Sequence, residues 1–212
     1  MPNFPEVENW LSQQGGYEHH CFISWPHTED DDLTDLALTV QAVIKKKLAA
    51  SFARPAVFLD EQVQGGDIWQ NRIRRALCRS VSMVAICAPI YYHPDHEWCG
   101  REWAAMEMIS DLRLRGKDFK TIIPLMYKLS NPLPQAVSSI EYIDVSRVIL
   151  LGRRYYSLTE FRAKIQQIVT SIERIAEELW RNQTRAECET FRIPPSAFLQ
   201  YAAPPPSFPI LS

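Results

Sequence analysis

The feature that most constrains the fold is an alternation of short apolar runs with longer segments of helical spacing. The central run, VSMVAICAPIYY at residues 81–92, is apolar along nearly its whole length. Such a run is typical of a parallel strand that is covered by helices on both faces. Further strands are predicted at HHCFISW (19–25), AVFLD (56–60), FKTIIPLMY (119–127) and EYIDVS (141–146). Strands that alternate with helices pair in parallel through right-handed crossovers.

Amphipathic helices are predicted between these strands. Residues 28–52 carry their acids first and their lysines last, which suits the helix dipole. Residues 68–80, 97–116 and 158–182 also have helical character. The sequence therefore predicts an α/β, flavodoxin-like doubly wound sheet of about five parallel strands with helices on both faces. In that architecture ligands bind outside the carboxyl ends of the strands.

The chain divides into three predicted parts. Residues 1–16 end in a Gly-Gly break and are interpreted as a lead-in segment, and residues 17–182 form the folded domain. Residues 183–212 are proline-rich, and we expect them to be extended or loosely docked.

Composition excludes several partners. A net charge of -2 gives no electrostatic case for a nucleic acid or an anionic membrane. No apolar run has the length of a membrane span, and no signal pattern opens the chain. The five cysteines show no CxxC pairing, which favours reduced thiols in a cytoplasmic protein over disulfides or zinc. The histidines lack ligand spacing, so no metal is expected.

One acid stands out in the predicted helix that contains EWCGREWAAMEMISDLRLRG. The helical neighbours of Glu102 are all apolar: Trp98, Cys99, Ala105, Met106 and Ile109. A carboxylate in such a stripe must be paired with a cation, be neutral or face a pocket. Because its helix follows the central strand, we expect Glu102 at the sheet edge where ligands bind.

Three sequence motifs resemble those of the TIR domain family. They are CFISW (21–25), the stretch VFLDEQVQGGDIWQNRIRRALCRSVSMVAICAPIYY (57–92) and EWCGRE (97–102), and the resemblance runs from about Tyr17 to Asn182. The chain departs from the family pattern at His96, where serine is usual, at Trp25, where tyrosine is usual, and at Gln-Gly-Gly, where Pro-Gly is usual.

The resemblance implies NAD cleavage, because Glu102 occupies the position of the catalytic glutamate in NAD-cleaving members. NAD is then a substrate, no cofactor is needed, and the products are nicotinamide with ADP-ribose or a cyclic isomer. The resemblance further implies activation by self-association through TIR–TIR contacts, possible control by a regulatory protein or domain, and a role in antiviral defence or cell-death signalling.

Further residues are candidates for substrate binding. Trp98 lies one helical turn from Glu102 and is placed to flank the nicotinamide. Two glycines would let the loop after Asp60 move, and Arg101 is a candidate phosphate ligand. The full set of substrate-binding candidates is Trp98, Phe22, Ser24, Trp25, Asp60, Gly65, Gly66 and Arg101.

Three alternatives remain open. Glu102 is a structural residue if an arginine or lysine pairs with it. The chain is a non-catalytic scaffold or effector if it acts only through TIR–TIR contacts. A nucleoside deoxyribosyltransferase of related architecture also uses a glutamate. A separate arginine cluster on residues 72–79 is either a solvated helix face or a self-assembly surface.

Overall fold

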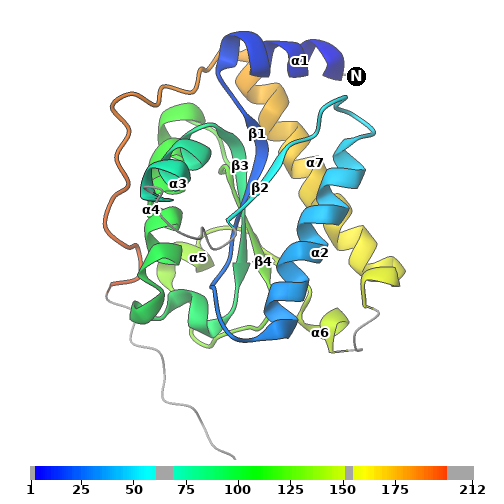
Figure 1. Cartoon of the computed structure of the whole chain (residues 1–212), viewed down its shortest axis with the longest axis vertical. Coiled ribbons are helices and arrows are strands. Elements are labelled where there is room, and N and C mark those ends of the chain that lie inside the picture. The colour runs from blue at the N-terminus through cyan, green and yellow to red at the C-terminus, as the bar shows by residue number, and fades with distance from the viewer. Residues whose placement is uncertain (1–2, 61–68, 151–154, 200–212) are drawn as a thin grey trace, which may run out of the picture.

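A computed structural model describes residues 3–60, 69–150 and 155–199. Five parallel strands form one sheet in the order β2-β1-β3-β4-β5 (Figure 1). The strands are β1 (His19–Ser24), β2 (Val57–Leu59), β3 (Ser80–Cys87), β4 (Ile122–Met126) and β5 (Ile143–Asp144). The predicted fold class is confirmed, and the chain reverses its strand order between β1 and β3.

Helices cover both faces of this sheet. One face carries α1 (Phe4–Trp10), α2 (Asp31–Leu48) and α7 (Thr159–Arg181), and the other carries α3 (Trp69–Cys78), α4 (Glu97–Arg113) and α5 (Gln135–Ser138) (Figure 1). Shorter turns are η1 (Leu11–Gly15), η2 (Pro89–Tyr92), η3 (Pro94–His96), α6 (Ser146–Ile149) and η4 (Tyr155–Ser157). The element that positions the candidate site is α4, which follows β3 by way of η2 and η3.

Side chains of the strands alternate between two apolar clusters, one on each face of the sheet. Along β1, Cys21 and Ile23 pack toward the α2 and α7 face, whereas Phe22 packs toward α3 and α4. Every residue of β3 is buried, as its continuous apolar sequence predicts. Burying an isoleucine or phenylalanine contributes roughly 1.5–3 kcal/mol, so the two clusters fix the position of β1 and β3 firmly.

Two features of the N-terminal part concern its helices: a side-chain cap at the start of α2 and a helix in the lead-in segment. Asp30 caps α2, because its carboxylate accepts hydrogen bonds from the amides of Asp32 and Leu33. The acidic residues at the beginning of the predicted helix 28–52 therefore mark the start of α2. The lead-in segment contains a helix, α1, that the sequence did not predict, and its Val7 and Trp10 are buried against the domain.

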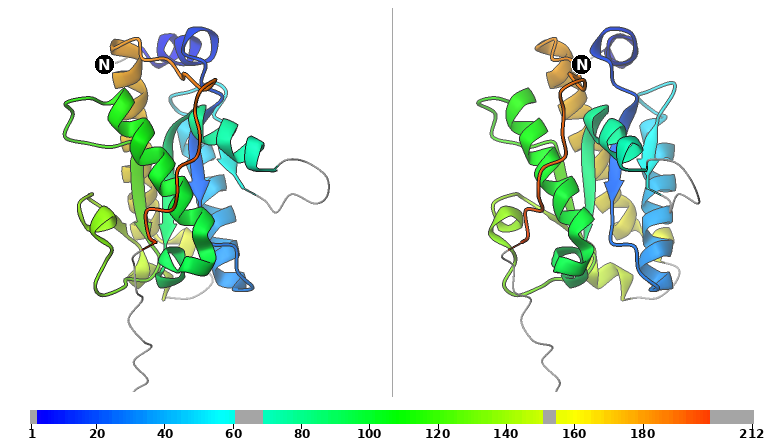
Figure 2. Two further views of the ribbon diagram at one scale, coloured as in Figure 1. Left: turned by 90° about the vertical axis from the view of Figure 1, so that its left-hand side faces the viewer. Right: turned by 60° about the vertical axis from the view of Figure 1, so that its left-hand side comes forward.

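The C-terminal segment, defined here as residues 184–199, is extended but packs closely on α3 and α4. Figure 2 shows it running along the outside of α4. Its Phe191 and Phe198 are buried in the cluster beneath those helices, and the Ala197 amide donates to the Gly100 carbonyl at 3.0 Å. These residues are therefore extended, as expected, but they are packed closely and not loosely docked. Residues 200–212 of the predicted tail lie outside the described residues.

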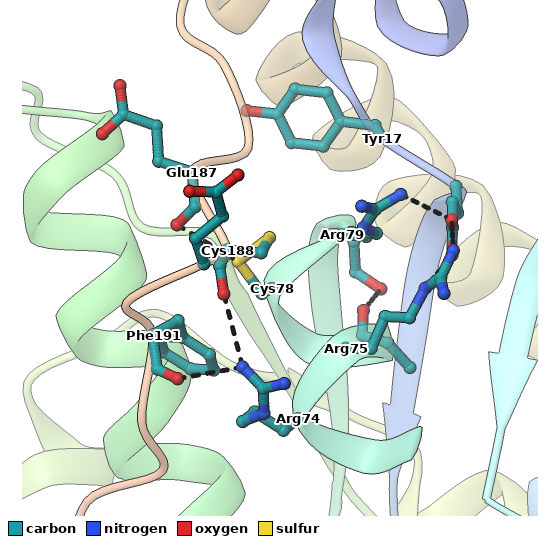
Figure 3. The surroundings of a disulfide bond; sticks show 12 residues. Tyr17, Arg74, Arg75, Cys78, Arg79, Glu187, Cys188 and Phe191 are labelled. Atoms are coloured by element: carbon teal, nitrogen blue, oxygen red, sulfur yellow. Dashed lines mark hydrogen bonds and ion pairs between the residues drawn. A yellow bond between two sulfur atoms is a disulfide. The ribbon is translucent and has the colours of Figure 1, made fainter. Parts of the chain in front are cut away.

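A disulfide between Cys78 on α3 and Cys188 anchors this segment (Figure 3). The Arg74 guanidinium adds hydrogen bonds to the carbonyls of Cys188 and Phe191. The prediction that all cysteines are reduced is wrong for this pair, because the fold joins residues 110 positions apart. Cys21, Cys87 and Cys99 are buried free thiols.

The disulfide weakens the prediction of a cytoplasmic location, because that prediction rested partly on all cysteines being reduced thiols. Among the residues described, no helix combines the length and the apolar character that crossing a bilayer requires.

Candidate functional site

The candidate site is a pocket at the carboxyl ends of β1 and β2, beside the start of α4. Its volume is about 590 Å³, within the usual range for small-molecule sites. The described residues that line it are Ile23, Trp25, His27, Asp60, Trp69, Pro94, Asp95, His96, Glu97, Trp98, Cys99 and Glu102. The pocket lies near the reversal of strand order, as the doubly wound architecture predicts.

Glu102 is the acid at the base of this pocket. Only 5% of its surface is exposed, and its apolar neighbours on α4 surround it as the stripe predicts. No lysine or arginine within the described ranges forms an ion pair with Glu102. The described residues therefore give no support to the alternative in which Glu102 is a structural residue paired with a cation. Burial raises the pKa of Glu102 to about 8, opposed by a hydrogen bond from Ser24 and reinforced by the nearby Asp60 carboxyl.

Ser24 contacts Glu102 directly. Its hydroxyl donates to Glu102 Oε2 at 2.5 Å and also lies 2.7 Å from the Tyr91 hydroxyl. Ser24 ends β1 and is 1% exposed, and it is not among the residues that line the pocket. The sequence placed Ser24 beside the pocket as a substrate-binding candidate, whereas in the structure it supports the acid.

A second carboxylate, Asp60, lines the same pocket. Burial raises the pKa of Asp60 to about 6, opposed by the positive charge of Arg72. His27 Nε2 lies 3.7 Å from Asp60 Oδ2, and burial lowers the pKa of His27, so the imidazole in this contact is neutral near pH 7. Trp25 donates its indole N–H to the Asp60 backbone carbonyl and stacks on His27. Asp60, one of the predicted substrate-binding candidates, therefore lies in the pocket.

Aromatic side chains form one wall of the pocket. Trp98 and Trp69 meet edge to face, with ring centroids 4.3 Å apart. The Arg101 guanidinium lies 4.5 Å from the Trp98 ring centroid and 3.7 Å from Glu97, and Arg101 is not among the lining residues. Arg101 and Trp69 thus both contact the Trp98 ring, and Trp98 and Trp69 line the pocket together.

Three other candidates are not brought to the pocket by the described structure. Phe22 is fully buried and stacks on Phe58 beneath the sheet, so its position is that of a core residue. Gly65 and Gly66 lie outside the described residues.

Trp69, His27 and His96 are pocket residues that the sequence did not select as site candidates. The predicted helix start at Ile68 was a signal for Trp69, because the first turn of a helix after a strand lies at the ligand-binding edge. Among the described residues, no group of histidine, cysteine and acidic side chains has the arrangement of a metal site.

The arrangement suits stabilisation of a positive charge. A buried carboxylate such as that of Glu102 interacts strongly with a cation, because few water dipoles screen it. The tryptophans supply flat surfaces for an aromatic ring, and Asp60, which follows the end of β2, adds a second acidic group.

Comparisons with known proteins identify the family of this chain. A comparison with curated proteins finds no match. Among solved structures, the chain is similar to the TIR domains of the activated Roq1 resistosome that directly recognises the pathogen effector XopQ. The identity is 18% and the TM-score 0.35, over 76% of this chain and 81% of that chain. A family model described as TIR domain (TIR_2) matches residues 22–155, which is more than half of the sequence. The chain therefore belongs to the TIR domain family.

Proposed function

We propose that this protein is an NAD⁺ nucleosidase that cleaves the bond between nicotinamide and ribose, with Glu102 as its catalytic residue. The observation that carries the proposal is the position of Glu102, a buried carboxylate that lines a pocket of ligand size and has no cationic partner among the described residues. The TIR family includes NAD-cleaving enzymes, which supports the same assignment.

The chemistry needs one carboxylate and no general acid. Nicotinamide carries a positive charge while it is bonded to ribose, and it takes both bonding electrons when it leaves as a neutral molecule. The ribose carbon then becomes an oxocarbenium ion, as in glycoside hydrolysis. Ionised Glu102 binds the ribose hydroxyls and stabilises this cation, while Trp98 and Trp69 flank the nicotinamide ring.

The charge of the substrate favours the active form of Glu102. In the free protein the pKa of Glu102 is about 8, so the acid is mostly protonated near pH 7. Bound NAD places the positive nicotinamide ring near the carboxyl, which lowers the pKa and promotes ionisation. The positively charged nicotinamide ring thus selects the carboxylate form of Glu102 that cleavage requires.

Either of two acceptors completes the reaction. Attack by water gives ADP-ribose, and attack by the adenine of the same molecule gives a cyclic product. We propose that self-association activates the enzyme and that NAD depletion or a product nucleotide acts in antiviral defence or cell-death signalling.

The test is release of nicotinamide from NAD by purified full-length protein at several protein concentrations, with and without a crowding agent. Chromatography of the products distinguishes ADP-ribose from a cyclic nucleotide. We expect Glu102→Gln to lower the rate by roughly 10²–10³-fold. Glu107→Gln is the matched control, since Glu107 is a half-buried acid on the same helix that does not line the pocket.

The possible results separate the alternatives. Cleavage that survives Glu102→Gln contradicts the assignment of Glu102. No cleavage at any concentration favours the non-catalytic scaffold, and exchange of bases on nucleosides without NAD cleavage favours a deoxyribosyltransferase.

A further inference from the structure

The hydrogen bonds behind Glu102 form a chain of three side chains. Glu102 Oε2 lies 2.5 Å from Ser24 Oγ, which lies 2.7 Å from the Tyr91 hydroxyl. The Tyr91 hydroxyl in turn lies 3.4 Å from the Cys99 carbonyl. Glu102, Ser24 and Tyr91 come from α4, β1 and η2, so the chain connects three elements that meet at the reversal of strand order.

The number of available protons fixes the direction of this chain when Glu102 is ionised. A carboxylate only accepts hydrogen bonds, and a serine hydroxyl has a single proton to donate. Ser24 must therefore give its proton to Glu102. The short contact between Ser24 and Tyr91 is then a hydrogen bond only if Tyr91 is the donor. Both hydroxyl dipoles point toward the carboxylate.

The direction reverses when Glu102 is protonated on Oε2. Glu102 then donates to Ser24, Ser24 donates to Tyr91, and Tyr91 donates to the Cys99 carbonyl. That last contact, at 3.4 Å, is longer than either bond of the ionised arrangement. The three side chains are hydrogen-bonded in both charge states, but the chain favours ionised Glu102 because hydrogen bonds to a charged acceptor are stronger.

We propose that Tyr91 is a positioning residue that acts through Ser24 to orient the Glu102 carboxylate and to favour its ionised form; its effect on catalysis rests on the proposed function. Tyr91 is fully buried and is not a lining residue of the pocket. Its hydroxyl therefore does not contact a ligand directly, and it reaches the pocket through Ser24 and Glu102 or through the longer contact with Cys99.

The rest of the structure holds Tyr91 rigidly in place. Its ring packs on Tyr92, Trp103 and Phe198, with centroids 5.6, 6.5 and 6.0 Å away. Phe198 belongs to the C-terminal segment, so this segment contacts the residue that supports the candidate catalytic acid. Removing only the hydroxyl leaves these ring contacts intact.

Other groups near Glu102 also influence its protonation. Asp60 faces it from the end of β2, and the thiols of Cys99 on α4 and Cys87 on β3 lie close to Tyr91 or Glu102. The histidines of the same pocket are His27 and His96. These groups remain unchanged in the substitutions below, so a difference between variants reports the hydroxyl chain.

The first experiment measures ionisation without catalysis. The ¹³C shift of the Glu102 side-chain carboxyl is titrated in the full-length protein, with the signal assigned by its loss in Glu102→Gln. We expect Tyr91→Phe to raise the titration midpoint by roughly 0.5 to 1 pH unit, because the ionised acid loses part of its support. Tyr92→Phe is the matched control, since it removes a buried hydroxyl that lies 3.9 Å from the Met126 sulfur.

A second variant separates the chain from a general packing effect. Ser24→Ala removes the link, so we expect it to raise the midpoint by itself. Tyr91→Phe should then cause no further change in the Ser24→Ala background. An unchanged midpoint in Tyr91→Phe, or the same change with and without Ser24, would overturn the proposal.

Kinetics distinguish this proposal from the proposed function. We expect Tyr91→Phe to lower kcat/KM for NAD roughly three- to tenfold at pH 7 and to approach the unmodified protein above pH 9. If the midpoint moves but NAD is not cleaved, the positioning role stands and the enzymatic assignment falls. If cleavage depends on Glu102 but neither the midpoint nor the pH profile moves, the enzyme stands and the positioning role is refuted.

Discussion

Replacing Glu102 with glutamine tests the burial of an ionisable group without any assay of catalysis. The folded protein raises the pKa of this acid from 4.5 to about 8, so folded chains keep a proton that unfolded chains release between those values. The associated stability is fully present below pH 4.5 and is lost as the pH rises through about 8. Because glutamine does not ionise, the stability of Glu102→Gln does not fall in this way as the pH rises.

The magnitude follows from the two pKa values. Each pKa unit corresponds to about 1.4 kcal/mol, so the cost of ionising Glu102 in the folded protein is roughly 4–5 kcal/mol. The free energy of unfolding of Glu102→Gln, minus that of the unmodified protein, should therefore rise by roughly this amount between pH 4 and pH 9. Taking the difference removes the contributions of other titrating groups that both proteins share.

The assay is urea denaturation at five or six pH values, followed by tryptophan fluorescence and circular dichroism. Glu178→Gln provides a control of opposite sign, since a hydrogen bond from Lys117 lowers the pKa of Glu178. Its stabilising effect is present above the unfolded pKa and is lost as the pH falls. A stability difference for Glu102→Gln that does not change with pH would refute the description of Glu102 as an acid with a strongly raised pKa.

Four further outcomes are expected. The kcat/KM for NAD should rise with pH up to about 8 as free Glu102 ionises, and a flat profile would contradict the role of its carboxylate. Trp98→Ala should raise KM at least severalfold while Trp98→Phe retains most binding, as measured by initial rates; equal effects would exclude a role for the aromatic surface. Cys188→Ser should lower the unfolding free energy by roughly 2–4 kcal/mol, and dithiothreitol should do the same to the unmodified protein but not to the variant. Gly100→Ala places a methyl group 2.9 Å from Ser196 Cβ and should therefore speed proteolysis after Arg192. An unchanged rate of proteolysis would contradict the close packing of the C-terminal segment.

The alternation of strands and helices was sufficient to predict the sheet, because each element buries a face whose spacing is visible in its own sequence. The same local logic found Glu102, since an acid among helical neighbours that are all apolar is conspicuous without knowledge of the fold. Trp98 and Asp60 followed from their places at the ends of predicted elements, and the structure brings both to the pocket.

What the sequence did not reveal depends on contacts between distant residues. Cys78 and Cys188 have no spacing signal, and only the course of the C-terminal segment brings them together. Tyr91 stands in an apolar run where a tyrosine reads as a core residue, so its hydroxyl contact with Ser24 was invisible. The prolines around Ser196 and Phe198 indicated an extended chain correctly, but they carried no information about the surface on which it lies.

The course of the C-terminal segment changes which atoms this protein offers to another molecule. Over Gly100 the outer layer of α4 is made by Ser196 and Ala197, with the Ala197 amide bonded to the helix and Phe198 buried. A neighbouring subunit that approaches α4 from this side contacts the backbone and small side chains of the C-terminal segment before it reaches the helix. Substitutions that are meant to map an assembly surface on this side should therefore be made in the C-terminal segment. A chain shortened before Cys188 would expose a different and more apolar surface.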